Sequence, residues 1–207
     1  MRKKNPNTVV YSPEVAADFK YKVAFALYDT LEERAPRSEA AQVRFEVARE
    51  YLERGLQDWT IGRLFELVCM APRSKKAWVA AQGKTDCYVK IRKPNGKIEY
   101  APAEAKTGGG RVGFLEEKNC PRYVVYMLIV CNKSVPAGRL VLPVVMTSQR
   151  FEDLLFECGA VKSTNGKHPE VAIQVSNKPL YEALVAYGEE TGMWFDPERV
   201  YNPEDFD

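Results

Sequence analysis

The segment Lys93-Pro94-Asn95-Gly96-Lys97 constrains the fold of this chain more than any other part of the sequence. Proline presets the backbone for a type I turn, and glycine suits the left-handed residue that closes a three-residue hairpin loop. In such a loop Lys93 faces Lys97, and this fixes which residues of the two strands lie opposite each other. A two-residue loop of Asn95 and Gly96 would instead shift the pairing by one residue.

The three-residue loop places Asp86 opposite Glu104, with both side chains on one face of the hairpin. Lys106 lies two residues beyond Glu104 and therefore shares this face. The other face is small and apolar, which indicates burial; it carries Cys87, Val89, Ile91, Ala101, Ala103 and Ala105. The turn and the hydrophobic pattern thus predict the same register.

Helical patterns precede the hairpin, each with a recognisable start and stop signal. The predicted helices run from Ser12 to Pro36, from Ser38 to Gly55 and from Asp58 to about Met70. The remaining elements are predicted strands at Ala77–Ala81, Cys87–Lys93, Lys97–Lys106, Tyr123–Cys131 and Leu140–Met146, and predicted helices at Ser148–Cys158 and Pro179–Thr191. Pro143 places the last strand near a sheet edge, because proline cannot donate to a ladder.

This order of elements predicts an α/β fold with a mixed sheet flanked by helices. We expect an N-terminal helical region over residues 1–57 and a core over residues 58–195. The acidic residues 196–207 are expected to form a loosely held tail, with the whole chain in one compact domain.

The composition excludes several classes of function. No apolar run approaches the roughly 18 residues that cross a bilayer, and the amino end has no secretory signal, so no membrane partner and a cytoplasmic location are expected. The five cysteines form no Cys-x-x-Cys pair, and His168 is the single histidine. Zinc sites, disulfide frameworks and Ser-His-Asp chemistry are therefore hard to build. Carboxylates and lysine remain as the groups for chemistry.

Opposite charges are segregated along the chain. Residues 73–122 carry 12 basic and 5 acidic side chains, whereas residues 151–207 carry 4 basic and 12 acidic ones. The basic segment suits a polyanion such as a phosphate backbone, and the alternative is a solvated hairpin whose lysines protect an edge strand. The predicted nucleic-acid-binding residues are Lys84, Lys90, Arg92, Arg111 and Lys118.

Gly83-Lys84-Thr85 resembles the end of a phosphate-binding loop. That motif requires a glycine five positions before Gly83, where Trp78 stands, and a helix afterwards, where a strand is predicted. A nucleoside triphosphate is therefore not expected as a ligand.

Two facing carboxylates repel each other unless a cation or a shared proton lies between them. A hard divalent cation at Asp86 and Glu104 would neutralise the pair and activate a water, and Lys106 could orient that water or stabilise developing charge. The alternative is an ordinary salt bridge between Lys106 and one carboxylate on an exposed sheet face.

Asp86, followed after a hairpin by Glu104-Ala105-Lys106, resembles the motif of the PD-(D/E)xK nuclease superfamily, which includes many restriction endonucleases. The resemblance covers roughly residues 58–146 and implies a restriction-endonuclease-like fold. It implies that Asp86 and Glu104 bind Mg²⁺, that the Ala105 carbonyl adds a ligand, and that Lys106 assists the attacking water. Glu66, on the preceding helix, matches the further acid that this family often supplies.

The resemblance implies an Mg²⁺-dependent endonuclease, with Mn²⁺ as a substitute, that hydrolyses phosphodiester bonds in DNA, as a type II restriction enzyme does. Duplex DNA is the expected substrate, and a homodimer would present one site to each strand. The alternative is a catalytically silent module that binds nucleic acid or a partner protein on the same scaffold.

Overall fold

The computed structural model describes residues 13–56, 59–71, 85–108, 111–113, 122–132, 135–140, 143–163, 170–172 and 178–206. The strand predicted at Ala77–Ala81 and the helix cap predicted at Asp58 lie outside these residues. The N-terminal helices and the central strands that the sequence predicts are all present, with ends that differ by a few residues.

In chain order the elements are α1 (Pro13–Arg34), η1 (Ala35–Arg37), α2 (Glu39–Glu53), α3 (Thr60–Cys69), β1 (Cys87–Arg92), β2 (Ile98–Gly108), β3 (Arg111–Gly113), β4 (Tyr123–Asn132), β5 (Val135–Leu140), β6 (Val144–Thr147), α5 (Ser148–Glu157), β7 (Val161–Ser163), β8 (Glu170–Ala172), α6 (Lys178–Thr191), β9 (Val200–Tyr201) and η2 (Pro203–Phe206). Local chemistry explains the helix ends. The Ser38 hydroxyl accepts a hydrogen bond from the Ala41 amide at 3.1 Å, and Gly55, at φ 87°, follows the end of α2.

Six of the described strands form one mixed sheet in the order β5-β4-β2-β1-β9, with β6 also paired to β4. β1 and β2 are antiparallel, β2 and β4 are parallel, and β5 and β6 pair one after the other with β4. The strand predicted at Leu140–Met146 is thus divided: β5 ends at Leu140, Pro143 follows, and β6 begins at Val144. A second sheet, β3-β8-β7, is one that the sequence did not predict.

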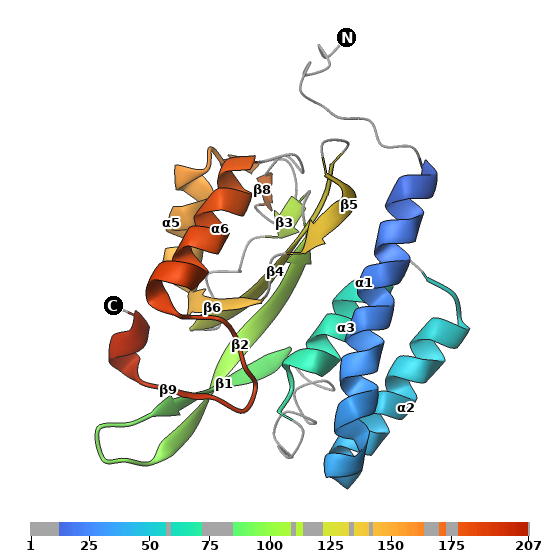
Figure 1. Ribbon diagram of the computed structural model, residues 1–207. Helices are drawn as coiled ribbons and strands as arrows, with labels where there is room; N and C mark the ends of the chain where they lie inside the picture. Colours follow the sequence, from blue (N-terminus) through green and yellow to red (C-terminus); the bar gives the residue numbers. More distant parts are fainter. Residues whose placement is uncertain are drawn as a thin grey trace.

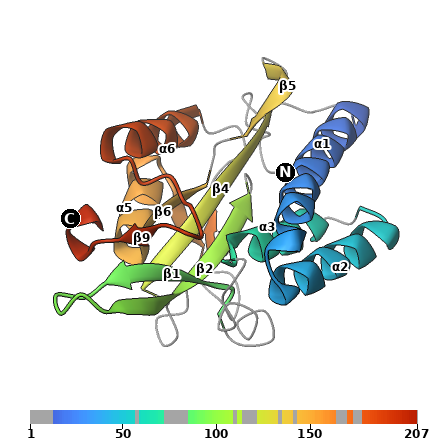
Figure 2. The same cartoon turned by 60° about the horizontal axis from the view of Figure 1, so that its bottom comes forward.

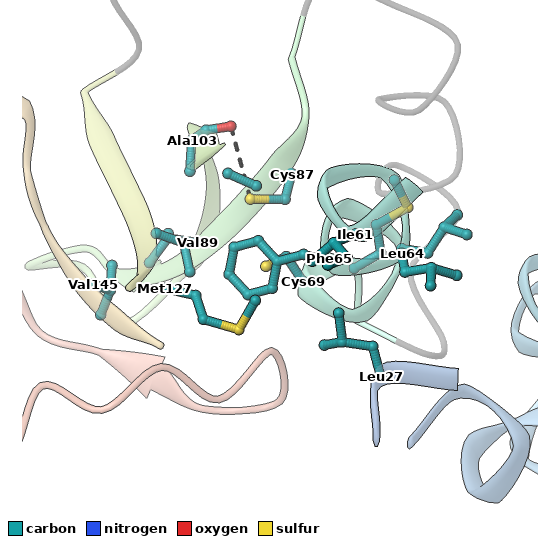
Figure 3. Close-up of a cluster of buried hydrophobic side chains, with 14 of the residues drawn as sticks. Leu27, Ile61, Leu64, Phe65, Cys69, Cys87, Val89, Ala103, Met127 and Val145 are labelled. Carbon is teal, nitrogen blue, oxygen red and sulfur yellow. Dashed lines mark hydrogen bonds between the residues drawn. The ribbon is translucent and has the colours of Figure 1, made fainter. Parts of the chain in front are cut away.

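Helices cover both faces of the larger sheet (Figure 1), as the mixed α/β prediction requires. The bundle of α1, α2 and α3 lies on one side, and α5 and α6 lie on the other (Figure 2). Two hydrophobic clusters fill the spaces between these layers. Phe65 of α3 lies in the first cluster, beside residues of β1 and β4 (Figure 3), and Tyr126 of β4 lies in the second.

The C-terminal segment is part of the fold, which corrects the expectation of a loosely held tail. β9 pairs in parallel with β1, so that Ile91 faces Tyr201, and the Tyr201 side chain is fully buried. The centroid of the Phe206 ring lies 4.7 Å from the centroid of the Tyr123 ring. The acidic composition of residues 196–207 concealed these two aromatic anchors.

Candidate active site

The hairpin has the register that the turn predicts. Cys87 faces Ala103 and Arg92 faces Ile98, which confirms the three-residue loop. The Lys93 amide donates to the Lys97 carbonyl at 2.8 Å, and Gly96, at φ 76°, donates to the Lys93 carbonyl at 2.8 Å. Only glycine adopts this left-handed conformation without strain, so Gly96 fixes the pairing of the two strands.

The apolar face of the hairpin is buried, as predicted. Its members are at most 8 % exposed: Cys87, Val89, Ile91, Ala101, Ala103 and Ala105. The Cys87 thiol lies 3.7 Å from the Ala103 carbonyl in this packed layer (Figure 3). Since side chains alternate along a strand, Glu104 and Lys106 project from the opposite face of β2.

Asp86 lies at the point where β1 begins. The Ala105 amide donates to the Asp86 carboxylate at 3.2 Å. In a regular antiparallel ladder this amide would bond to a carbonyl of the neighbouring strand, and here the side chain supplies the acceptor. The bond ties Asp86 to the middle residue of the Glu104-Ala105-Lys106 motif.

The pKa of Asp86 is raised to about 6. Burial is the largest cause, followed by the negative charges of Glu104 and Glu66. The Ala105 hydrogen bond and the charge of Lys106 act in the opposite direction. Asp86 is therefore within electrostatic range of each of the other charged residues that the sequence assigned to the site, and burial together with the two acidic neighbours outweighs the positive charge of Lys106.

Lys106 and Glu104 form an ion pair of 2.6 Å, with their side chains 26 % and 23 % exposed. The parallel register of β2 and β4 sets Glu104 beside Val124 and Lys106 beside Tyr126. Both β4 side chains belong to the hydrophobic cluster under α5 and α6. The ion pair thus lies on the α5 and α6 side of the sheet and keeps contact with solvent.

Glu66 belongs to α3 and is close enough to Asp86 for its negative charge to raise the pKa of that carboxyl. Packing and hydrogen bonds hold this helix in place. Leu64 and Phe65 are fully buried. At its C-terminal end, Arg34 donates to the Val68 carbonyl at 2.7 Å, and Arg44 donates to the Ala71 carbonyl at 2.7 Å. These guanidinium groups satisfy carbonyls that the helix leaves without partners and complement its dipole.

The side chain of Glu66 is 21 % exposed and forms a 2.6 Å ion pair with Arg63. Arg63 is 53 % exposed, and its pKa is raised first by its bond to Glu66, with a smaller contribution from Asp86. Two of the three carboxylates, Glu66 and Glu104, are therefore engaged by cationic side chains, whereas Asp86 is bonded to a backbone amide.

The carboxylates of the candidate site are ligands of the type that binds Mg²⁺, although among the described residues they are not arranged as a metal site. Asp86, Glu104 and Glu66 offer carboxylate oxygens, which hard divalent cations prefer. Within the described residues, however, no three acidic, histidine or cysteine side chains are grouped so that they could hold a metal ion. Mg²⁺ is usually bound through one or two carboxylates and retains several waters, so Asp86 and Glu104 would supply enough carboxylates for it.

The predicted nucleic-acid-binding residues differ in exposure and in whether they form ion pairs. Lys90 is only 13 % exposed and forms a 2.9 Å ion pair with Glu198 of the C-terminal segment. Arg92 is exposed at the end of β1, and Arg111 begins β3. Lys84 and Lys118 lie outside the described residues. The basic and acidic segments thus neutralise each other at Lys90, which the charge count alone did not reveal.

Trp59, which precedes α3, and Arg63, on α3, share a helix face with Glu66, and neither was predicted from the sequence as a site residue. Their spacing from Glu66 was the available signal, because residues three and four apart share a helix face.

A cavity of about 340 Å³ lies elsewhere, among α5, α6 and η2, lined in part by Arg150 and Tyr187. None of the carboxylates of the candidate site lines it.

No protein-family model, curated protein or solved structure significantly matches the chain. Among the helices that the structure describes, none combines the length and apolar character needed to cross a membrane.

Proposed function

We propose that this protein is an Mg²⁺-dependent nuclease acting on DNA, with Asp86, Glu104 and Lys106 at its active site and Glu66 as a further acid. The observation that carries the proposal is the hairpin register, which sets Asp86 against the Glu104-Ala105-Lys106 motif through the 3.2 Å bond from the Ala105 amide. The order of helix, hairpin and parallel β4 is consistent with a restriction-endonuclease-like scaffold.

Each residue has a definable part in this proposal. Asp86 and Glu104 would hold the cation, with the Ala105 carbonyl as an additional oxygen, and a bound Mg²⁺ would lower the pKa of a water and stabilise charge on a phosphoryl oxygen. Lys106 already lies 2.6 Å from Glu104. Its ammonium group can therefore orient a water beside that carboxylate or contact the developing charge.

A catalytically silent binding module is the second candidate. It is favoured by the ion pairs that engage two of the carboxylates, Lys106 with Glu104 and Arg63 with Glu66. In that case the charged residues would serve structure alone, and removing one of them would leave any interaction with DNA intact.

Lys106→Ala should lower the rate of Mg²⁺-dependent DNA cleavage by about a hundredfold, the usual cost of losing one positioned catalytic group. Supercoiled plasmid, linear duplex, single strands and RNA would be incubated with Mg²⁺, Mn²⁺ or EDTA and resolved on gels. Lys93→Ala is the matched control, since Lys93 is an exposed lysine of the same hairpin that pairs with Glu99 at 3.1 Å. Its cleavage rate should equal that of the wild type.

Absence of cleavage on all of these substrates would refute the nuclease proposal. Cleavage that survives both EDTA and the Lys106→Ala substitution would refute it equally. If the assay shows that both strands of a duplex are cut, we expect a homodimer, which analytical ultracentrifugation of the same preparation would detect.

A further inference from the structure

An aromatic and a basic side chain lie in line with Glu66 on the surface of α3. Trp59, Arg63 and Glu66 are spaced four and three residues apart, and such residues lie one above the other on a helix face. Trp59 is 48 % exposed although it is large and apolar, and Arg63 is 53 % exposed. Glu66, at 21 %, is the least exposed of the three.

The Trp59 ring is held in one orientation by Tyr51 of α2. The two rings meet edge to face, with centroids 5.6 Å apart and planes at 90°. Tyr51 itself is partly buried against the first hydrophobic cluster. A large aromatic ring that is already oriented loses little conformational freedom when a ligand stacks on it.

Arg63 lies between this ring and Glu66 along the helix. Its guanidinium donates to Glu66 at 2.6 Å, and its pKa is raised first by Glu66 and to a smaller extent by Asp86. A guanidinium has five N–H donors, so the bond to Glu66 leaves others for a phosphate. Along this helix face an exposed ring, Trp59, is followed by a cation, Arg63, and then by Glu66, a carboxylate of the proposed metal site.

We propose that Trp59 and Arg63 form a subsite for single-stranded DNA, in which the ring of Trp59 stacks on a base and Arg63 contacts a backbone phosphate next to the cleavage site. This inference rests on the proposed nuclease function and names its substrate class. In a duplex the faces of the bases are already stacked on one another, whereas an unpaired base can offer its face to an aromatic ring.

The chemistry on the surface favours a nucleic-acid strand as the occupant. Stacking on a base and contact with a phosphate need an exposed ring and a cation, and Trp59, just before α3, and Arg63, on α3, supply them. The segment that follows α3, residues 73–122, carries seven more basic than acidic side chains. A polyanionic strand would be attracted to this part of the chain.

Binding of fluorescently labelled oligonucleotides, measured by anisotropy in EDTA, tests the inference without any cleavage. The probes are a single strand of about 15 nucleotides, within the site sizes known for strand-binding folds, and the duplex of the same sequence. Wild type should bind the single strand more tightly than the duplex. Trp59→Ala should weaken single-strand binding by about tenfold, and Trp59→Phe, which keeps a ring, should retain most of it.

Phe156→Ala is the matched control, because Phe156 is an aromatic residue of similar exposure, 40 %, on α5. Its affinity for the single strand should not change. Arg63→Gln should lower the slope of log affinity against log salt by about 0.7, the value for one phosphate contact on a single strand. Circular dichroism would confirm that each variant is folded, as expected for substitutions at exposed positions.

Equal affinity of wild type and Trp59→Ala for the single strand would overturn the inference, as would a duplex that binds wild type more tightly than the single strand. Because EDTA prevents metal-dependent cleavage, either result would leave the nuclease proposal to be decided by the Lys106→Ala comparison. Conversely, loss of single-strand binding in Trp59→Ala would support the subsite even if no substrate were cut.

Discussion

Asp86→Asn should strongly slow Mg²⁺-dependent cleavage and at the same time make the metal-free protein more stable at neutral pH. A cation ligand contributes several kcal/mol to the stabilisation of charge in the transition state, so its loss should slow cleavage by about a hundredfold to a thousandfold. The gain in stability has a separate origin. Asparagine keeps an oxygen for the Ala105 amide and removes a charge that burial, Glu104 and Glu66 all disfavour.

The pH dependence of this gain follows from the pKa of Asp86. In the folded protein it is about 6, well above the ordinary value for an aspartate. Below about pH 3 the carboxyl group is mostly protonated in both states, and near pH 4 only part of the unfolded chain has lost the proton, so the substitution should have little effect there. As the pH rises toward 6 the unfolded chain loses its proton first, and the folded state loses stability. Above pH 6 the ionised Asp86 lowers the free energy of unfolding of the wild type by its full amount.

Urea unfolding in EDTA at pH 4 and pH 7.5 measures this effect. We expect the free energy of unfolding of Asp86→Asn to exceed that of wild type by about 1–2 kcal/mol at pH 7.5, after allowance for the partial exposure of the carboxylate. Glu99→Gln is the control, because Glu99 is an exposed acid of the same hairpin. A variant that is less stable than wild type at pH 7.5 would show that the Asp86 charge supports the fold.

Tyr201→Ala should lower the free energy of unfolding by about 3–4 kcal/mol, as expected for removing a fully buried aromatic side chain. The Tyr201 ring has no exposed surface, and burial raises the pKa of its hydroxyl to about 12. This hydroxyl donates to the Trp194 carbonyl at 3.1 Å and accepts from the Asp196 amide at 2.9 Å. The ring also lies 5.9 Å from that of Phe206.

Urea unfolding of Tyr201→Ala and Tyr201→Phe separates packing from hydrogen bonding. Phenylalanine keeps the ring and should cost about 1–2 kcal/mol, because only the two polar contacts are lost. If Tyr201→Ala changes stability by less than about 1 kcal/mol, the C-terminal segment is the loosely held tail that its acidic composition suggested.

The hairpin was predictable because its determinants are local. The turn at Pro94 to Gly96 fixes the pairing, and alternation of small apolar residues fixes the buried face, so two independent signals specify one register. Asp86 and Glu104 follow from that register without knowledge of the rest of the fold. The helix ends at Ser38 and Gly55 were predictable for the same reason.

The parts that escaped prediction depend on contacts between distant segments. β9 pairs with β1 across more than a hundred residues, and only two residues, Val200 and Tyr201, carry the pairing. The ion pair of Lys90 with Glu198 reduces the basic surface in a way that the separate charge counts of the two segments cannot show. The position of α3 against the hairpin, which brings Arg63 and Glu66 toward Asp86, likewise requires the packed core.

Isothermal titration of the metal-free protein with Mg²⁺ at pH 7.5 tests the proposed site most directly. We predict one class of site near Asp86 and Glu104, with affinity reduced at least about tenfold in Glu104→Gln and in Asp86→Asn, and unchanged in Glu99→Gln. At pH 6 binding should release protons, because the Asp86 carboxyl must ionise to bind the cation. Absence of Mg²⁺ binding by wild type, or binding that is equal in the wild type and both site variants, would contradict a metal-dependent active site on this hairpin.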